Sequence, residues 1–264
     1  MSIKKRVEIF GDSILKGIQI NPKNMRYHVD NNIDIELIEK RHLLSIINFS
    51  KFGCTVTKGL ALLEKRLKGN KPSCDAILMD FGGNDCDFNW KEISECPDDE
   101  HLPHTPLNVF VDTYHKIIAL LSENGIRPIM TTLPPLDANK FFNWYCNGLN
   151  KPNVLKWLGN IDLIVRWQGS CSKAVEKITG GANAPENIDV IYRWQESYSK
   201  AIEKIAAGTN TLLVDLRGAF LRHSSPEHLL CEDGTHPNTE GQKIITQTFL
   251  EFIENAKIKG EIMI

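Results

Sequence analysis

Apolar residues gather in short runs that suit β-strands, separated by longer stretches with a different period. The runs occupy 4–10, 45–49, 75–81, 127–133 and 211–216. The run at 75–81 is almost entirely apolar, which is typical of a parallel strand buried on both faces. Five strands are therefore predicted, spaced widely enough for a helix between most of them.

Between these runs, apolar residues recur every three or four positions, as on one face of a helix. Helices are predicted over 55–68, 106–124, 188–207 and 237–255, and a first helical turn over 14–18. Residues 19–44 are polar and show no clear period, and 86–105 reads as a polar loop. Strands alternating with helices predict an α/β fold, a flavodoxin-like three-layer α/β/α sandwich around a five-stranded parallel sheet.

Residues 160–183 and 187–210 form a tandem repeat in which 16 of 24 positions are identical. Two copies are too few for a solenoid, so we interpret the repeat as a duplicated helix. The second copy leads into the fifth strand and is expected to belong to the sandwich. We expect residues 1–264 to form one domain, with an insertion or cap at about 137–187 that includes the first copy.

Composition narrows the function classes. Of 264 residues, 42% are hydrophobic and 24% charged, and the net charge is -2, so nothing favours nucleic acid or an anionic membrane as a partner. No apolar run is long enough for a membrane span or a signal peptide. The seven cysteines show no paired spacing and suit reduced thiols, which predicts a cytoplasmic protein. The oligomeric state is left open.

Four loops carry residues suited to acyl transfer. Ser13 follows the first strand, Gly53 the second and Asn84 the third, while Asp233 and His236 share a loop before the last helix. A serine at a strand end is exposed where open α/β sheets bind ligands. An imidazole can take its proton, and a carboxylate can orient the imidazole.

Each residue also has a structural interpretation. Ser13 can be a helix cap, Gly53 a turn glycine, Asn84 a bridge between loops and His236 a cap of the last helix. Asp12 is expected to brace its own loop. Four such residues at one edge of one sheet favour the catalytic interpretation.

At this point the chain resembles the SGNH hydrolase, or GDSL-type, family. The matching motifs are Gly11-Asp12-Ser13, Gly53, Gly82-Gly83-Asn84-Asp85 and Asp233-x-x-His236, in the family's order. Ile14 replaces the leucine that gives the GDSL motif its name. The resemblance implies a nucleophile at Ser13, a base at His236 oriented by Asp233, and an oxyanion hole from the N–H groups of Ser13 and Gly53 and the side-chain amide of Asn84. It implies no metal or organic cofactor.

The resemblance predicts a serine esterase that acts on a small-molecule carboxylic ester. We favour a short acyl group such as acetyl, because no long apolar tunnel is indicated and aromatic loop residues could stack on a sugar. Candidate substrate-binding residues are Asp12, Phe88, Trp90 and Trp144, although the aromatic ones are equally typical of a core. The alternatives are a lysophospholipase or thioesterase, an acyltransferase, and a non-catalytic ester- or carbohydrate-binding module. An acidic and histidine cluster at 98–104 matches no standard zinc spacing, so no metal is predicted.

Overall fold

The computed structural model describes residues 4–30, 32–68, 74–168 and 188–258, without the side chains of 160–168. Its centre is a parallel sheet of five strands in the order β4-β1-β5-β6-β7. The strands are β1 (Lys5–Gly11), β4 (Leu44–Asn48), β5 (Ala76–Asp80), β6 (Arg127–Thr131) and β7 (Leu212–Val214). All four pairings between them are parallel, as the sequence predicts.

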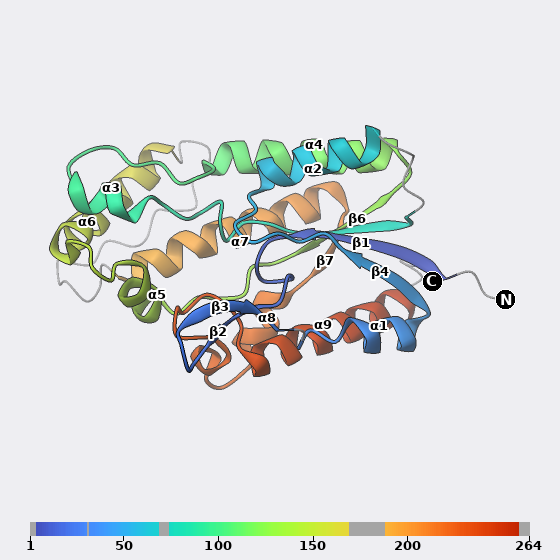
Figure 1. Cartoon of the computed structure of the whole chain (residues 1–264). Helices are drawn as coiled ribbons and strands as arrows, with labels where there is room; N and C mark the ends of the chain where they lie inside the picture. The colour runs from blue at the N-terminus through green and yellow to red at the C-terminus, as the bar shows by residue number, and fades with distance from the viewer. Residues whose placement is uncertain (1–3, 31, 69–73, 169–187, 259–264) are drawn as a thin grey trace.

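Helices cover both faces of this sheet (Figure 1). On one face lie α2 (Val56–Lys68), α4 (Leu107–Glu123) and α7 (Asp189–Thr209), and on the other α1 (Ile35–His42), α8 (Leu216–Leu221) and α9 (Thr239–Ile258). The alternation of side chains along β1 divides the core in two. Phe10 packs into the cluster under α2, α4 and α7, and Ile9 into the cluster under α1 and α9. The predicted three-layer α/β/α sandwich is confirmed.

Among the described residues, four further helical segments lie outside the sheet and the six helices that cover it. They are α3 (Trp90–Glu95), α5 (Ala138–Tyr145), α6 (Lys151–Gln168) and the 3-10 helix η1 (Pro226–Leu229). The short α3 was not predicted within the polar loop 86–105. It forms because the Asn89 side chain accepts from the Glu92 N–H, while Trp90 and Ile93 are buried. The fifth strand is shorter than predicted, because Asp215 caps α8 and Leu216 already begins that helix.

The predicted helical turn after Ser13 does not continue as a helix, and that expectation is corrected. Residues 13–17 form a single turn, and Gly17 at φ +75 then redirects the chain into β2 (Ile18–Asn21). A Cβ at Gly17 would lie 2.7 Å from the Asp30 carbonyl oxygen, so this position requires glycine. β2 pairs antiparallel with β3 (Arg26–Val29), and this hairpin was missed within the unassigned polar stretch.

The second copy of the tandem repeat forms α7 and leads into β7, as predicted. The first copy begins in the last part of α6, and most of it lies outside the described residues. Among the described residues, no helix has the length and apolar character that a membrane crossing requires.

Candidate active site

Ser13 is positioned by the close approach of three loops at the carboxyl ends of the strands. Gly11 ends β1 where a Cβ would lie 3.0 Å from the Cβ of Asp80 and 3.1 Å from the Ser50 hydroxyl. The Lys51 N–H donates to the Gly11 carbonyl at 3.0 Å, and the Asp12 N–H donates to the Asp80 carbonyl at 3.1 Å. The loops that follow β1, β4 and β5 are thus bonded to one another directly beneath Ser13.

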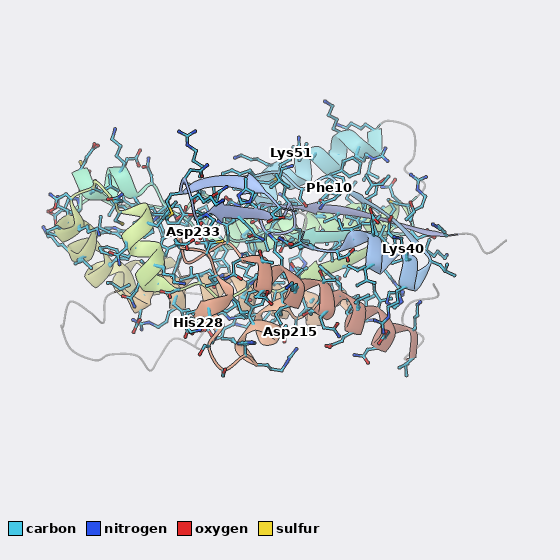
Figure 2. The ribbon with its side chains drawn as sticks, turned by 60° about the horizontal axis from the view of Figure 1, so that its bottom comes forward. Phe10, Lys40, Lys51, Asp215, His228 and Asp233 are labelled. Atoms are coloured by element: carbon cyan, nitrogen blue, oxygen red, sulfur yellow. The ribbon has the colours of Figure 1, made fainter. Side chains whose placement is uncertain are left out.

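The loop before α9 has its own tight geometry. Gly234 adopts φ +70, and a Cβ there would meet the Asp137 carbonyl oxygen at 2.5 Å. The Asp137 N–H donates to the Gly234 carbonyl at 2.8 Å, which joins this loop to the start of α5. The Cys231 N–H donates to the His236 carbonyl at 2.8 Å. These contacts hold His236 against the sheet. Figure 2 shows Asp233 of the same loop well separated, along the sheet, from Lys40 near the strand beginnings.

The predicted nucleophile, base and carboxylate form one hydrogen-bonded chain. Ser13 Oγ lies 2.9 Å from His236 Nε2, and His236 Nδ1 lies 2.6 Å from Asp233 Oδ2. The other carboxylate oxygen accepts from the backbone N–H groups of Thr235 at 3.0 Å and His236 at 3.1 Å. With the carboxylate as acceptor, Nδ1 carries a hydrogen and Nε2 is free to accept from the serine hydroxyl.

The Asp233 carboxylate is fully buried yet held in its charged form. Burial alone would raise its pKa, but the hydrogen bond and positive charge from His236, with the two N–H donors, hold the pKa of Asp233 below its ordinary value. Such a carboxylate stays ionised at neutral pH and keeps the imidazole in one orientation.

The predicted oxyanion donors lie in the adjoining loops. Gly53 has φ +69, and apart from its chain neighbours no heavy atom lies within 4 Å of where a Cβ would be, so space beside its backbone is open. Asn84 donates from Nδ2 to Asp12 Oδ2 at 2.9 Å and, at a longer 3.4 Å, to the Cys54 carbonyl. The shorter bond to Asp12 fixes the orientation of the amide, and the oxyanion role of Asn84 stays a prediction.

Three buried carboxyl groups lie beneath these loops. Asp12 accepts from the Ile14 N–H at 2.9 Å, Asp80 accepts from the Thr131 hydroxyl at 2.7 Å, and Asp85 accepts from the Val56 N–H at 3.0 and 3.1 Å. Burial raises the pKa of Asp80 to about 6 and that of Asp85 to about 6. Burial also raises the pKa of Asp12 well above its ordinary value, with the charges of Asp80 and Asp85 adding to the effect.

These contacts identify what the carboxyl groups do. Asp12 braces its own loop and orients Asn84, as expected of a bracing residue, and is 2% exposed. Asp85 caps α2 from the loop after β5. The predicted contact of Asp12 with substrate stays a prediction.

An aromatic rim that the sequence did not reveal surrounds the imidazole. The Tyr27 hydroxyl of β3 donates to Asp233 Oδ2 at 3.2 Å and accepts from Trp144 Nε1 at 3.0 Å. The Phe52 ring is stacked with the His236 ring at 6.1 Å and 8°, and Phe52 is 54% exposed. Burial raises the pKa of Tyr27 to about 12, so the hydroxyl remains a donor at neutral pH. Tyr27 was missed because its own strand, β3, is only four residues long, mostly exposed and without a hydrophobic period.

The predicted substrate-binding aromatics fall into two groups. Trp144 belongs to the rim through Tyr27, whereas Phe88 and Trp90 are buried in the core and contact Trp157 with ring centroids at 4.9 and 6.2 Å. Phe88 and Trp90 also line a cavity of about 40 Å³ that reaches Gly83 and Thr235 on either side of the candidate site.

The acidic and histidine cluster at 98–104 is dispersed in the structure. Asp98 pairs with Lys156 at 2.7 Å, His101 Nε2 lies 2.7 Å from the Cys96 carbonyl, and His104 Nδ1 lies 3.0 Å from the Asn84 carbonyl. Across the described ranges, no group of three or more His, Cys, Asp or Glu side chains could hold a metal ion.

The fold and the site geometry define an ester hydrolase of the α/β sandwich class. The sequence profile of the GDSL-like lipase/acylhydrolase family matches residues 9–244, and the chain belongs to this family. Among curated proteins, none matches the chain.

Solved structures with the same fold cover nearly the whole chain. A lipase/acylhydrolase from Enterococcus faecalis is 17% identical with a TM-score of 0.59, covering 95% of this chain and 96% of its own. The acetylxylan esterase Axe2 from Geobacillus stearothermophilus is 18% identical with a TM-score of 0.59, covering 96% of each chain. An α/β hydrolase, LAE5, from the metagenome of Lake Arreo, Spain, is 19% identical with a TM-score of 0.56, covering 96% of this chain and 97% of its own.

Proposed function

We propose that the chain is a serine esterase that releases short acyl groups, acetyl above all, through an acyl-enzyme on Ser13. The observation that carries this proposal is the continuous hydrogen-bonded chain from Ser13 Oγ through His236 to Asp233. A binding module has no need for a paired base, so this geometry supports catalysis over the non-catalytic alternative.

In the proposed reaction, His236 Nε2 takes the Ser13 proton while Oγ attacks the ester carbonyl carbon. The oxyanion that forms accepts hydrogen bonds from the N–H groups of Ser13 and Gly53 and from the Asn84 amide. Collapse expels the alcohol, which receives the proton from His236. Water, activated by the same imidazole, then attacks the acyl-enzyme and releases the carboxylic acid.

Two observations support a short acyl group. The cavity beside Gly83 and Thr235 is only about 40 Å³, room for a methyl group and little more. Its lining includes the chain neighbours Gly83 of Asn84 and Thr235 of His236. A much larger apolar cavity of about 450 Å³ exists, but it is lined neither by Ser13, Gly53, Asn84, Asp233 or His236 nor by any residue adjacent to one of them in the chain. The large cavity is therefore not the acyl site of this proposal.

The structural neighbours support the same assignment. Axe2 is an acetylxylan esterase, and in structures of its catalytic mutants a serine or a histidine is replaced by alanine. An acetylated carbohydrate is accordingly the substrate class we propose, with the exposed Phe52 and the half-buried Trp144 of the rim beside the sugar. A reducing compartment such as the cytoplasm is part of the proposal, because the six described cysteines are free.

The test is hydrolysis of p-nitrophenyl acetate, butyrate and octanoate, and of acetylated xylooligosaccharides, by the wild type and Ser13→Ala. We expect acetate to be preferred and the activity to fall by about 10⁵ or more in Ser13→Ala, since a nucleophile in such a triad contributes on that order. The matched control is Ser122→Ala, at an exposed position on α4. Equal activity of wild type and Ser13→Ala would falsify the proposal, and preference for octanoate would remove its short-acyl part.

A further inference from the structure

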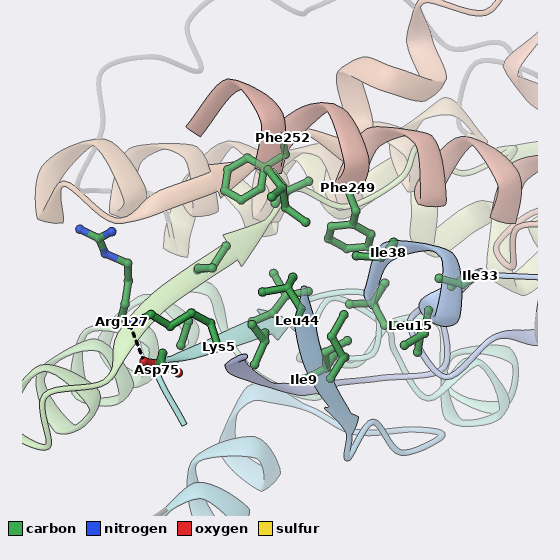
Figure 3. A pocket seen from close by; sticks show the side chains of 18 residues that line it. Lys5, Ile9, Leu15, Ile33, Ile38, Leu44, Asp75, Arg127, Phe249 and Phe252 are labelled. Carbon is green, nitrogen blue, oxygen red and sulfur yellow. Dashed lines mark hydrogen bonds and ion pairs between the residues drawn. The ribbon is translucent and has the colours of Figure 1, made fainter. Parts of the chain in front are cut away.

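A long apolar cavity of about 450 Å³ lies between the sheet and the helices α1 and α9 (Figure 3). Its walls are aliphatic and aromatic side chains from both the strands and the helices. They include Ile9, Leu78 and Ile129 from the sheet and Ile38, Phe249 and Phe252 from the helices. The volume is within the range of pockets that hold small organic ligands.

The charged residues of the cavity lie together at one end. Lys5 and Arg127 begin β1 and β6, and Asp75 immediately precedes β5, so all three lie at the edge of the sheet where its strands begin. Lys5 Nζ pairs with Asp75 Oδ1 at 3.0 Å, and the Arg127 N–H donates to the Asp75 carbonyl at 3.0 Å. The Lys5 and Asp75 side chains are 42% and 44% exposed, so this end faces solvent.

The opposite end of the cavity is lined by apolar residues, among them Leu15 and Ile33, as Figure 3 shows. The path along β1 from Lys5 to Ile9 is roughly 13 Å at the rise of a parallel strand. An extended ten-carbon chain has about this length. The cavity is therefore an apolar space of this length with charged residues at one end.

A water-filled interior does not suit such walls. A stable buried water needs two to four polar partners, and the polar side chains that line this cavity are Lys5, Asp75 and Arg127 at its mouth. An apolar chain suits the interior, because its binding removes the apolar side chains of the cavity walls from water. The mouth carries two cationic side chains against one carboxylate, which favours an anionic head group over a cationic one.

We propose that this cavity is a binding site for a single-chain fatty acid of about ten carbons, with its carboxylate at Lys5 and Arg127 and its chain along β1 beneath α9. The charged mouth of the site lies at the strand beginnings, whereas Ser13 and His236 lie at the strand ends and line no part of the cavity. It is therefore a ligand site separate from the ester-hydrolysing site, and it does not depend on the proposed esterase activity.

The test is calorimetric titration of the purified full chain with decanoate, hexanoate and decanol. We expect saturable binding of one decanoate, at least tenfold tighter than hexanoate because each buried methylene contributes, and tighter than decanol because decanol lacks the charge. Absence of saturable decanoate binding overturns the proposal. Equal affinity for decanoate and decanol overturns the assigned head-group contact.

Two sets of variants locate the site. Lys5→Glu with Arg127→Glu should weaken decanoate binding about tenfold and leave decanol unaffected. The matched charge reversal Lys40→Glu, on the exposed face of α1 and outside the lining, should change neither. Ala76→Phe places a ring in the cavity and should abolish binding of both ligands, provided that its circular dichroism spectrum and thermal unfolding remain those of a folded protein.

Further controls separate this site from other occupants. Ser13→Ala should bind decanoate as the wild type does, and loss of binding there would place the fatty acid in the ester site and overturn the proposal. A chain ending at Ile258 tests whether the last residues are the natural occupant. If only this shortened chain binds decanoate, the cavity belongs to the chain's own end and the proposal is wrong.

Discussion

The two ends of the central sheet are built on opposite principles. Where the strands end, buried polar groups are held in hydrogen bonds, as with His236 and Asp233 at 2.6 Å and Asn84 and Asp12 at 2.9 Å. Where the strands begin, an apolar cavity of about 450 Å³ lies beneath a small cluster of surface charges. The first region fixes side chains in position, and the second offers unfilled volume.

The difference shows how each region can tolerate change. A buried polar network loses function when one partner is removed, because the remaining group is left unsatisfied. An apolar cavity is costly for the opposite reason. The side chains that line unfilled volume lack packing partners on one side, so their dispersion contacts are lost. At the strand ends, function should therefore depend on the chemical identity of single polar groups. At the strand beginnings, stability should depend on side-chain volume.

The largest effect that tests this contrast is expected from Asp233→Asn. The amide retains the shape but holds the wrong imidazole tautomer, so kcat should fall by about 10⁴ on p-nitrophenyl acetate. Asp99→Asn, in an exposed loop, is the matched control. A loss below tenfold would mean that Asp233 does not orient His236 during turnover.

The next effect is expected from Asn84→Ala, which removes a predicted oxyanion donor. Turnover should fall by about 10²–10³ with little change in KM, because the bond is made mainly in the transition state. Asp12→Asn retains an acceptor oxygen beside Asn84 and should cost less than Asn84→Ala. If the two variants lose equal activity, the bracing contact rather than the amide itself accounts for the loss.

A stability effect of intermediate size is expected from Asp80→Asn beneath the nucleophile. The folded-state pKa of Asp80 is about 6, above the ordinary value of 3.8, so its stabilising contribution is present at low pH and is lost as the pH rises through about 6. Above that pH the wild-type protein holds a buried charge, which asparagine does not carry, so the free energy of unfolding at pH 8 should rise by about 3 kcal/mol.

The pH dependence of this gain in stability provides a control. Denaturant unfolding should show the gain shrinking as the pH falls from 8 toward 4, because the wild-type carboxyl then becomes neutral as well. Asp112→Asn, at an exposed position on α4, should show no such trend. A gain that is independent of pH would contradict the assignment to Asp80 ionisation.

The smallest effect is expected from Tyr27→Phe in the rim. Loss of the hydroxyl removes one donor from Asp233, so kcat should fall severalfold, consistent with a single hydrogen bond. The loss should appear in kcat with KM nearly unchanged, because the Tyr27 hydroxyl contacts Asp233. Tyr192→Phe, which retains the ring that faces Arg217, is the control. A kcat equal to that of the wild type would assign Tyr27 to packing alone.

The same contrast explains what the sequence could predict. Ser13, Asp233 and His236 could be named in advance because acyl transfer demands particular side chains at strand ends, and the structure brings them together. The strands of the sheet and most of the helices that cover it could be predicted from the periodic spacing of apolar residues along the chain. The Tyr27 hairpin was not, because its two strands are only four residues long and β3 is mostly exposed, so no alternation stands out over enough residues.

The cavity escaped prediction for a different reason. Its lining consists mainly of residues such as Ile9, Leu78 and Phe249, which any core contains, so only their spacing in three dimensions reveals the missing volume. Phe88 and Trp90 show the same ambiguity between core and site. They lie beside a motif and were candidates for substrate binding, but both are buried in the core rather than on the rim.

The hydrogen bond from Ser13 to His236 joins residues 223 positions apart. During synthesis at about 5–20 residues per second, roughly 10–45 s therefore separate the arrival of the two groups. For that interval Ser13 is attached to a growing polypeptide that lacks His236. Under the proposed mechanism, a ribosome that stalls anywhere between the two leaves a fragment without its general base, so ester turnover would report translation that has passed His236.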